Sequence, residues 1–131
     1  MRVVLIAQGD ANRRLLADSL DAMGLTVRVA NDQDSALNLI QTSRPDLVLV
    51  ELPDCGDAAV QTLRELRAVD GGRQAYCIAM IPPEAVVGVA YLMLAGASDF
   101  LLQNFSEAAL MVRLSSAQRV VALQGAVRAE S

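Results

Sequence analysis

The sequence predicts an α/β domain in which helices cover both faces of a single parallel β-sheet. Short runs rich in Val, Ile and Leu recur along the chain, and each is followed by a stretch whose apolar residues have helical spacing. Runs that are apolar throughout indicate strands buried on both faces, as a parallel sheet between helices requires. The length of 131 residues and the hydrophobic content of 53% suit one domain and leave no room for a second.

The first strand and helix follow from residues 3–24. Residues 3–7 form an apolar run with β-branched side chains and predict a central strand. Asp10 is placed to cap a helix over residues 11–23, and Gly24 stands where a helix commonly ends in the left-handed conformation. The apolar residues of this helix recur on one face, at Leu16, Leu20 and Met23.

The second and third strands are predicted at residues 25–30 and 46–51. Between them Asn31-Asp32 caps a helix that Pro45 prevents from continuing. The helix after the third strand has an apolar face made of Val60, Leu63 and Leu66.

The last two units begin with a buried strand at residues 76–81. Pro83 then opens a helix, as Pro does at a first helical position, and Gly96 ends it. Residues 100–102 form the last strand, and Ser106 caps a long final helix. Alternating strands and helices of this kind place the functional site beyond the carboxyl ends of the strands.

Four segments at matching spacing resemble the receiver domains of bacterial response regulators: Arg13-Arg14-Leu15-Leu16, Gly24-Leu25, residues 44–52 and residues 95–101. The resemblance implies the flavodoxin-like (βα)5 fold, a doubly wound five-stranded parallel sheet with strand order 2-1-3-4-5. It covers nearly the whole chain, so we place a receiver-like domain at residues 1–120 and an extension of the last helix at residues 121–131.

The residues that carry receiver chemistry are missing. By this resemblance the site needs an acidic pair after the first strand to hold Mg²⁺, an Asp nucleophile ending the third strand, a Thr or Ser ending the fourth and a Lys ending the fifth. At those positions the chain has Ala7 and Gln8, then Glu51, Ile81 and Gln103. None of them matches, which is the pattern of a degenerate receiver, or pseudoreceiver.

Physical chemistry also argues against phosphorylation. Phosphoryl transfer depends on positioning and on cations that stabilise oxygen charge, whereas this chain contains no Lys and no His. A Glu carboxylate lies one methylene farther out than that of Asp, a displacement of about 1 Å that costs about 100-fold in rate. We therefore expect no enzymatic activity, no phosphorylation at Glu51 and no cofactor.

Two other interpretations of the acidic residues stay open. Glu51 either imitates a phosphorylated Asp or is a solvated carboxylate at the end of a strand, and we favour the second because no Lys or hydroxyl partner stands opposite it. Asp10, Asp54 and Asp57 could join Glu51 around a hard cation. We favour helix capping for Asp10 and Asp57, and so expect no metal site.

The two cysteines and the start of the chain indicate a reduced, cytoplasmic protein. Met1-Arg2 leads directly into a strand and not into a signal-peptide pattern. Cys77 falls within a buried strand and is expected to be a small core residue. Cys55 could be a redox-sensitive thiol on its loop, but no basic neighbour in sequence lowers its pKa, so we favour an inert thiol.

Two apolar stretches predict contact surfaces. Residues 85–95 predict a helix that is apolar on nearly all of its faces. Val87, Tyr91 and Leu94 should form a stripe on its outer face, which we expect to be covered by a contacting protein surface. The alternative is an unusually apolar helix with a few exposed side chains. In the final helix an a/d spacing over less than two heptads suggests a short coiled coil, made of Val120, Leu123 and Val127.

These observations predict a phosphorylation-independent signalling module of a two-component phosphorelay, acting by protein contact or dimerisation through the fourth helix, fifth strand and fifth helix. The alternative is a small-molecule or metal sensor that uses the vacated acidic pocket. We expect a homodimer, and the resemblance implies a partner or output domain joined through the last helix. The net charge of −4 argues against binding to nucleic acid or to an anionic membrane.

Overall fold

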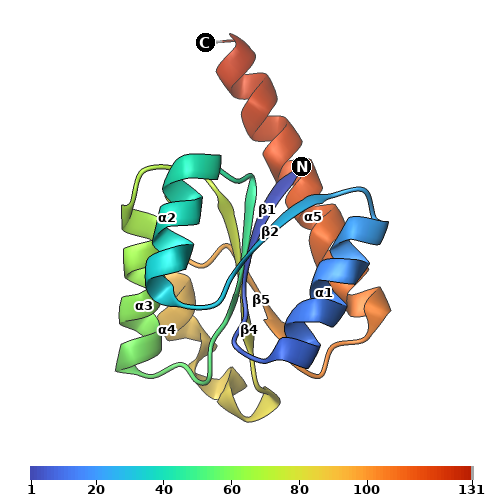
Figure 1. Cartoon of the computed structure of the whole chain (residues 1–131). Helices are drawn as coiled ribbons and strands as arrows, with labels where there is room; N and C mark the ends of the chain where they lie inside the picture. The colour runs from blue at the N-terminus through green and yellow to red at the C-terminus, as the bar shows by residue number, and fades with distance from the viewer. Residues whose placement is uncertain (131) are drawn as a thin grey trace.

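The computed structural model describes the backbone of residues 1–130 and the side chains up to Gly125. Its centre is a five-stranded parallel sheet in the order β2-β1-β3-β4-β5, which confirms the predicted topology (Figure 1). The register aligns the strands closely, with Val3 beside both Val27 and Leu47. All carboxyl ends therefore meet at one end of the sheet.

The bounds of the elements agree with the expected alternation of strands and helices. The strands are β1 (Arg2–Ile6), β2 (Thr26–Ala30), β3 (Leu47–Glu51), β4 (Tyr76–Ile81) and β5 (Asp99–Leu102). The α-helices are α1 (Asp10–Ala22), α2 (Gln33–Ser43), α3 (Asp57–Ala68), α4 (Val89–Leu94) and α5 (Glu107–Glu130), and a 3₁₀ helix, η1 (Pro83–Gly88), precedes α4.

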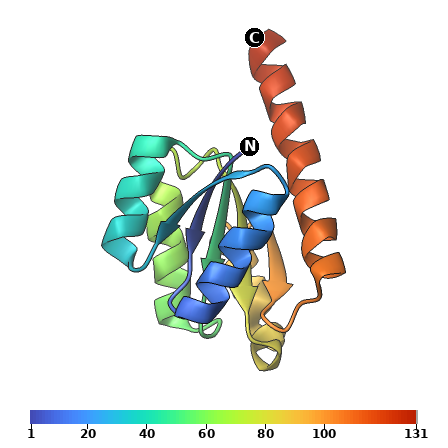
Figure 2. The ribbon, with the colours of Figure 1, turned by 45° about the vertical axis from the view of Figure 1, so that its right-hand side comes forward.

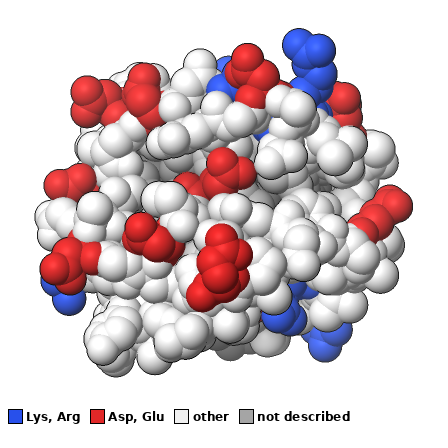
Figure 3. All heavy atoms as spheres, turned by 90° about the horizontal axis from the view of Figure 1, so that it is seen from below, with Lys and Arg blue, Asp and Glu red and all other residues white. Residues whose placement is uncertain are grey.

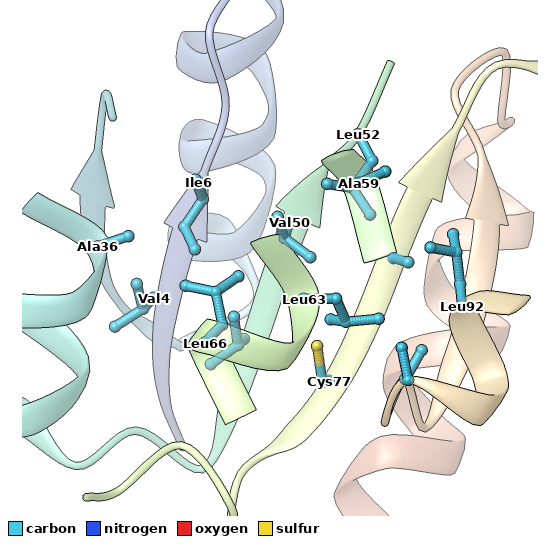
Figure 4. Packing of buried hydrophobic residues seen from close by; sticks show 14 of the residues in the cluster. Val4, Ile6, Ala36, Val50, Leu52, Ala59, Leu63, Leu66, Cys77 and Leu92 are labelled. Carbon is cyan, nitrogen blue, oxygen red and sulfur yellow. The ribbon is translucent and has the colours of Figure 1, made fainter. Parts of the chain in front are cut away.

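Helices cover both faces of the sheet and bury an apolar cluster on each. On one face α2, α3 and α4 pack over Val4, Val50 and Cys77 (Figure 4). On the other face α1 and α5 pack over Leu5 and Leu49. The two helices lie on the same side of the sheet in Figure 2. No polar or charged residue is buried among the described residues, so hydrophobic burial dominates the stability of the fold.

The starts of two helices differ from the predictions. The N-caps of α1 and α3 are Gly9 and Gly56, both in extended conformation, and Asp10 and Asp57 are instead the first helical residues. The capping roles predicted for Asp10 and Asp57 are therefore wrong, although an acidic residue in a first turn still favours the helix dipole. The cap predicted at Asp32 is confirmed, since its carboxylate accepts a hydrogen bond from the Ser35 amide at 2.8 Å.

The other predicted caps are confirmed. The hydroxyl oxygen of Ser106 accepts a hydrogen bond from the amide of Ala109 at 3.1 Å, at the start of α5. After α1, Gly24 has a φ of 81°, in the left-handed region that favours glycine.

The segment after β4 is the main departure from the predicted elements. A single helix was expected from Pro83 to Gly96, but the chain forms η1 first and only then the short α4. A Cβ at Gly88 would lie 2.9 Å from the Cβ of Cys55, so the loop after β3 approaches the backbone closely at the junction. Such a tertiary contact, together with the low helix propensity of neighbouring valines, interrupts the helix.

Helix α5 runs beyond the end of the sheet and projects from the domain (Figure 2). Its last buried residue among those described is Ala117, whereas the helix itself continues to Glu130. None of the helices within residues 1–130 is both long enough and apolar enough to cross a membrane.

Candidate functional site

The five positions that would carry receiver chemistry lie at the carboxyl ends of the strands. Ala7 follows β1 and is fully buried, while the next residue, Gln8, is exposed. Ile81, the last residue of β4, is also fully buried and offers an apolar surface in place of a hydroxyl. Glu51 ends β3 and Gln103 follows β5, and both are half-buried.

Of these positions, the structure brings Glu51 and Gln103 together around one small cavity. The cavity has a volume of about 120 Å³, and its walls include Leu16, Met80 and Phe105. Ala7, Gln8 and Ile81 do not line it. Two of the five positions therefore line the cavity, and the other three do not.

Gln103 ties the ends of three strands together. Its side-chain Nε2 donates hydrogen bonds to the main-chain oxygens of Leu52 at 3.0 Å and Met80 at 3.1 Å. Its main-chain amide also donates to the oxygen of Ile81 at 2.7 Å. Where the resemblance places a Lys that would stabilise phosphoryl oxygens, this side chain is committed to backbone carbonyls.

Glu51 has no cationic partner among the residues whose side chains are described. Within the described part of the chain its carboxylate forms no ion pair and no side-chain hydrogen bond. The basic residue Arg13 pairs with Asp10 and donates to Asn31 Oδ1 at 2.7 Å and to the main-chain oxygen of Ala7 at 3.4 Å. Arg13 is thus paired with Asp10, and no described cation pairs with Glu51 to supply the positive charge that phosphoryl transfer requires.

The surface around this site is acidic. Figure 3 shows the end of the molecule where the strands finish, with acidic side chains across its middle and Arg side chains toward its margin. The carboxylates do not gather into a metal site, since no three His, Cys, Asp or Glu residues within the described part of the chain could hold an ion together. Asp54 instead accepts a hydrogen bond from the amide of Gly56 at 2.8 Å.

The cysteines differ sharply in environment. Cys77 is fully buried, and burial raises the pKa of its thiol to about 11. Cys55 is half-buried and its sulfur donates to the main-chain oxygen of Ala85 at 3.3 Å. Burial and then the nearby Asp54 carboxylate raise the pKa of the Cys55 thiol, which is the opposite of an activated thiol.

The apolar stripe on the segment after β4 is exposed. Val87 is 90% exposed, Tyr91 65% and Leu94 84%, and these residues come from η1 and α4. Three exposed residues that the sequence analysis did not single out add to the apolar surface of the domain: Leu15 on α1, and Met111 and Val112 on α5. Exposed apolar residues on α4 are what a contact surface requires, although the contact itself remains a prediction.

The predicted seam on α5 falls partly on a groove. Val120 is half-buried and Leu123 is exposed, and both line a groove of about 660 Å³ at the end of the sheet opposite Glu51. The side chain of Val127 lies outside the described residues. No local sequence pattern indicates this groove, because its walls come from segments far apart in the chain.

Comparison with family models finds no match. Among curated proteins, the sensor histidine kinase RcsC of Escherichia coli K12 is 36% identical over 69 residues, which is 50% of this chain. The same match covers 7% of RcsC, and the homologous kinase of Salmonella typhi shows the same identity and coverage. The chain therefore spans only a small part of the length of these relatives.

Solved structures with the same fold are receiver domains of response regulators and related proteins. The signal receiver domain of a modulated diguanylate cyclase from Desulfovibrio desulfuricans has a TM-score of 0.75 at 21% identity, covering 94% of this chain and 97% of that one. The beryllofluoride-activated receiver domain of RstA from Klebsiella pneumoniae has a TM-score of 0.78 at 24% identity, covering 91% and 99%. NtrX from Brucella abortus reaches 0.86 at 21% identity, covering 99% of this chain and 29% of that one. The chain has the receiver fold.

Proposed function

We propose that this domain is a signalling module of a two-component system that works without phosphorylation, through contact with other protein surfaces. The receiver fold supports a place in such a system, as does the partial likeness to a protein named a sensor histidine kinase. A binding role agrees with the chemistry of the site, since a fold can persist while the residues for one function are replaced.

The observation that carries the proposal is the hydrogen bonding of Gln103. Its amide reaches two backbone carbonyls at the place where a cation would be needed. Phosphoryl transfer to Glu51 would develop negative charge on oxygens, and no cation among the described residues pairs with Glu51 to stabilise it. Ala7 and Ile81 are buried and apolar, and so supply neither a metal ligand nor a hydroxyl.

The contact surface we propose is the face formed by α4, β5 and α5, with the stripe of Val87, Tyr91 and Leu94 at its centre. Apolar surface removed from water contributes about 25 cal/mol per Å². Burying these three side chains on both copies of a symmetric contact contributes several kcal/mol, from which the cost of association is subtracted. We expect the balance to allow dimers at micromolar concentration. A twofold contact uses the same patch on both copies, so we propose a homodimer.

The test is the oligomeric state of a charged variant, measured by light scattering and sedimentation. Leu94→Glu places a carboxylate in the stripe, and we expect it to convert a dimer into a monomer with unchanged circular dichroism. Leu15→Glu is the matched control, because Leu15 is 67% exposed on α1, a helix that is not part of the α4, β5 and α5 surface. It should leave the dimer intact. A monomeric wild type at high concentration, or a Leu94→Glu variant that still dimerises, contradicts this surface.

A further inference from the structure

The groove at the amino-terminal end of the sheet has the size of a small-molecule site. Its volume of about 660 Å³ lies between the roughly 300 and 1,000 Å³ typical of ligand pockets. It lies where α5 passes the start of β4 and the loop before β5, and its lining includes Tyr76 and Ser98. This end is opposite the Glu51 cavity, so the two sites share no residue.

One wall of the groove is apolar. Tyr76 begins β4 and is half-buried, and its neighbour Ala75 is buried. On the side of α5, Val120 is half-buried and Leu123 is 67% exposed. These side chains leave apolar surface facing an open space, which favours a ligand with an apolar body.

The other wall carries an arginine that is fixed in place without a counter-ion. The Nη1 of Arg67 donates to the main-chain oxygens of Gly72, at 2.8 Å, and Ala75, and its Nη2 donates to that of Arg73 at 3.3 Å. The stem of Arg67 passes against Gly96, where an added Cβ would lie 3.0 Å from Cγ. Three neutral carbonyls hold the guanidinium, and it forms none of the ion pairs found in the described residues.

The side-chain amides of Gln74 and Gln124 also line the groove, and Ser98 and Arg73 add further donors. Ser98 Oγ accepts a hydrogen bond from the amide of Cys77 at 3.0 Å, so its own hydroxyl hydrogen is available to a ligand. Arg73 is exposed and has no ion pair within the described part of the chain. No Asp or Glu side chain among the described residues lines the groove, although the chain has a net charge of −4.

We propose that this groove binds a small amphipathic anion, a carboxylate with an apolar chain of medium length. The apolar chain lies along Tyr76, Val120 and Leu123, and the carboxylate is held by Arg67 and Arg73. Neither arginine pairs with a carboxylate among the described residues, so the two give the groove a positive charge that complements this anion. Such a ligand joins α5 to the sheet, and its binding is independent of any event at Glu51.

The test is calorimetric titration of the full chain with decanoate below its micelle concentration, alongside thermal unfolding. We expect saturable binding of one decanoate and a rise in the unfolding midpoint, because a ligand of the folded state stabilises it. Inorganic phosphate should not bind measurably, because it lacks the apolar chain. Decanol should bind about tenfold more weakly, which corresponds to the loss of roughly 1.4 kcal/mol of charged hydrogen bonding.

Two variants and one control locate the site. Leu123→Glu adds a negative charge to an exposed position and should weaken decanoate binding by about tenfold or more. Arg73→Gln removes an exposed charge and should weaken decanoate but not decanol. Arg119→Gln is the control, since Arg119 is an exposed arginine of α5 outside the groove lining, and it should bind as the wild type does. Absence of saturable binding, or equal binding by Leu123→Glu, overturns the proposal.

Discussion

The side-chain amide of Gln103 donates a hydrogen bond to the main-chain oxygen of Leu52 across 3.0 Å, although the two residues are 51 positions apart in the sequence. β4 lies between their strands in the sheet, and the same amide also bonds Met80 at the end of that strand. A single side chain thus joins the carboxyl ends of β3, β4 and β5, and the loops after these strands are fixed relative to one another.

Removing this link should cost stability. Gln103→Leu keeps the volume roughly constant but deletes two hydrogen bonds, which contribute about 0.5–1.5 kcal/mol each. We expect the free energy of unfolding in urea to fall by about 1–3 kcal/mol. Gln61→Leu is the control, since the amide of Gln61 is exposed and bonds only Glu65, at 3.4 Å. An equal loss in both variants would show that the link contributes nothing of its own.

Phosphodonors should leave the domain unchanged. With Mg²⁺ and acetyl phosphate, or with Mg²⁺ and beryllofluoride, we expect no mass adduct and no change in circular dichroism or NMR spectra. The reason is that no cation faces Glu51 among the described residues, while Ala7 and Ile81 are apolar and buried. A phosphoryl adduct on Glu51 or on any Asp would disprove the proposed mode of action.

The charge of Glu51 should have little effect on stability. Its carboxylate is half-buried and has no ion-pair partner in the described residues, so Glu51→Gln removes no strong interaction. We expect a change within about 0.5 kcal/mol in the free energy of unfolding and an unaltered dimer equilibrium. A large shift of that equilibrium would instead favour the interpretation of Glu51 as an imitation of a phosphorylated Asp.

Stability should fall in alkaline solution because of Cys77. Burial raises the pKa of this thiol from 9.0 to about 11, so the folded state holds the proton more tightly than the unfolded state does. The stabilisation is fully present below pH 9 and is lost as the pH rises toward about 11, by at most roughly 2–3 kcal/mol. Urea unfolding between pH 8 and 11 measures this loss.

Two alanine variants assign that loss to one thiol. Cys55→Ala should keep most of the alkaline loss, because the fully buried thiol of Cys77 is still present. Cys77→Ala should start from a lower stability, since it opens a cavity in the core, but should show a smaller dependence on pH. If both variants lose stability equally with rising pH, other groups are responsible.

The strands could be predicted from the sequence because their burial is visible in it. A run of residues that is apolar on both faces fits a strand in a sheet covered on both sides. β4 accordingly has the predicted bounds, and β3 begins only one residue later than predicted. The caps Asp32 and Ser106 were also predictable, because capping is a local interaction between a side chain and nearby amides.

The features that escaped prediction depend on tertiary contacts. The break between η1 and α4 coincides with the close approach of Cys55 to Gly88, more than 30 positions away. The groove is lined by residues of α3, β4, α5 and the loops between them. A local sequence pattern cannot predict that these distant segments come together. The sequence shows that the metal ligands, the hydroxyl and the Lys of a receiver site are missing around Glu51. It does not show that Gln103, at the position of the Lys, donates a hydrogen bond to the main-chain oxygen of Leu52.

Helix α5 can act as a lever. Its 24 residues rise about 1.5 Å each, so it is about 36 Å long, while its last buried residue among those described is Ala117. The part beyond Ala117 is about 20 Å long, so a tilt of about 10° at that residue would move the far end by about 3 Å. Small repacking between the helix and the sheet is therefore magnified at the distal turns. We expect labels near Ala117 and Gly125 to report the same tilt with different amplitudes.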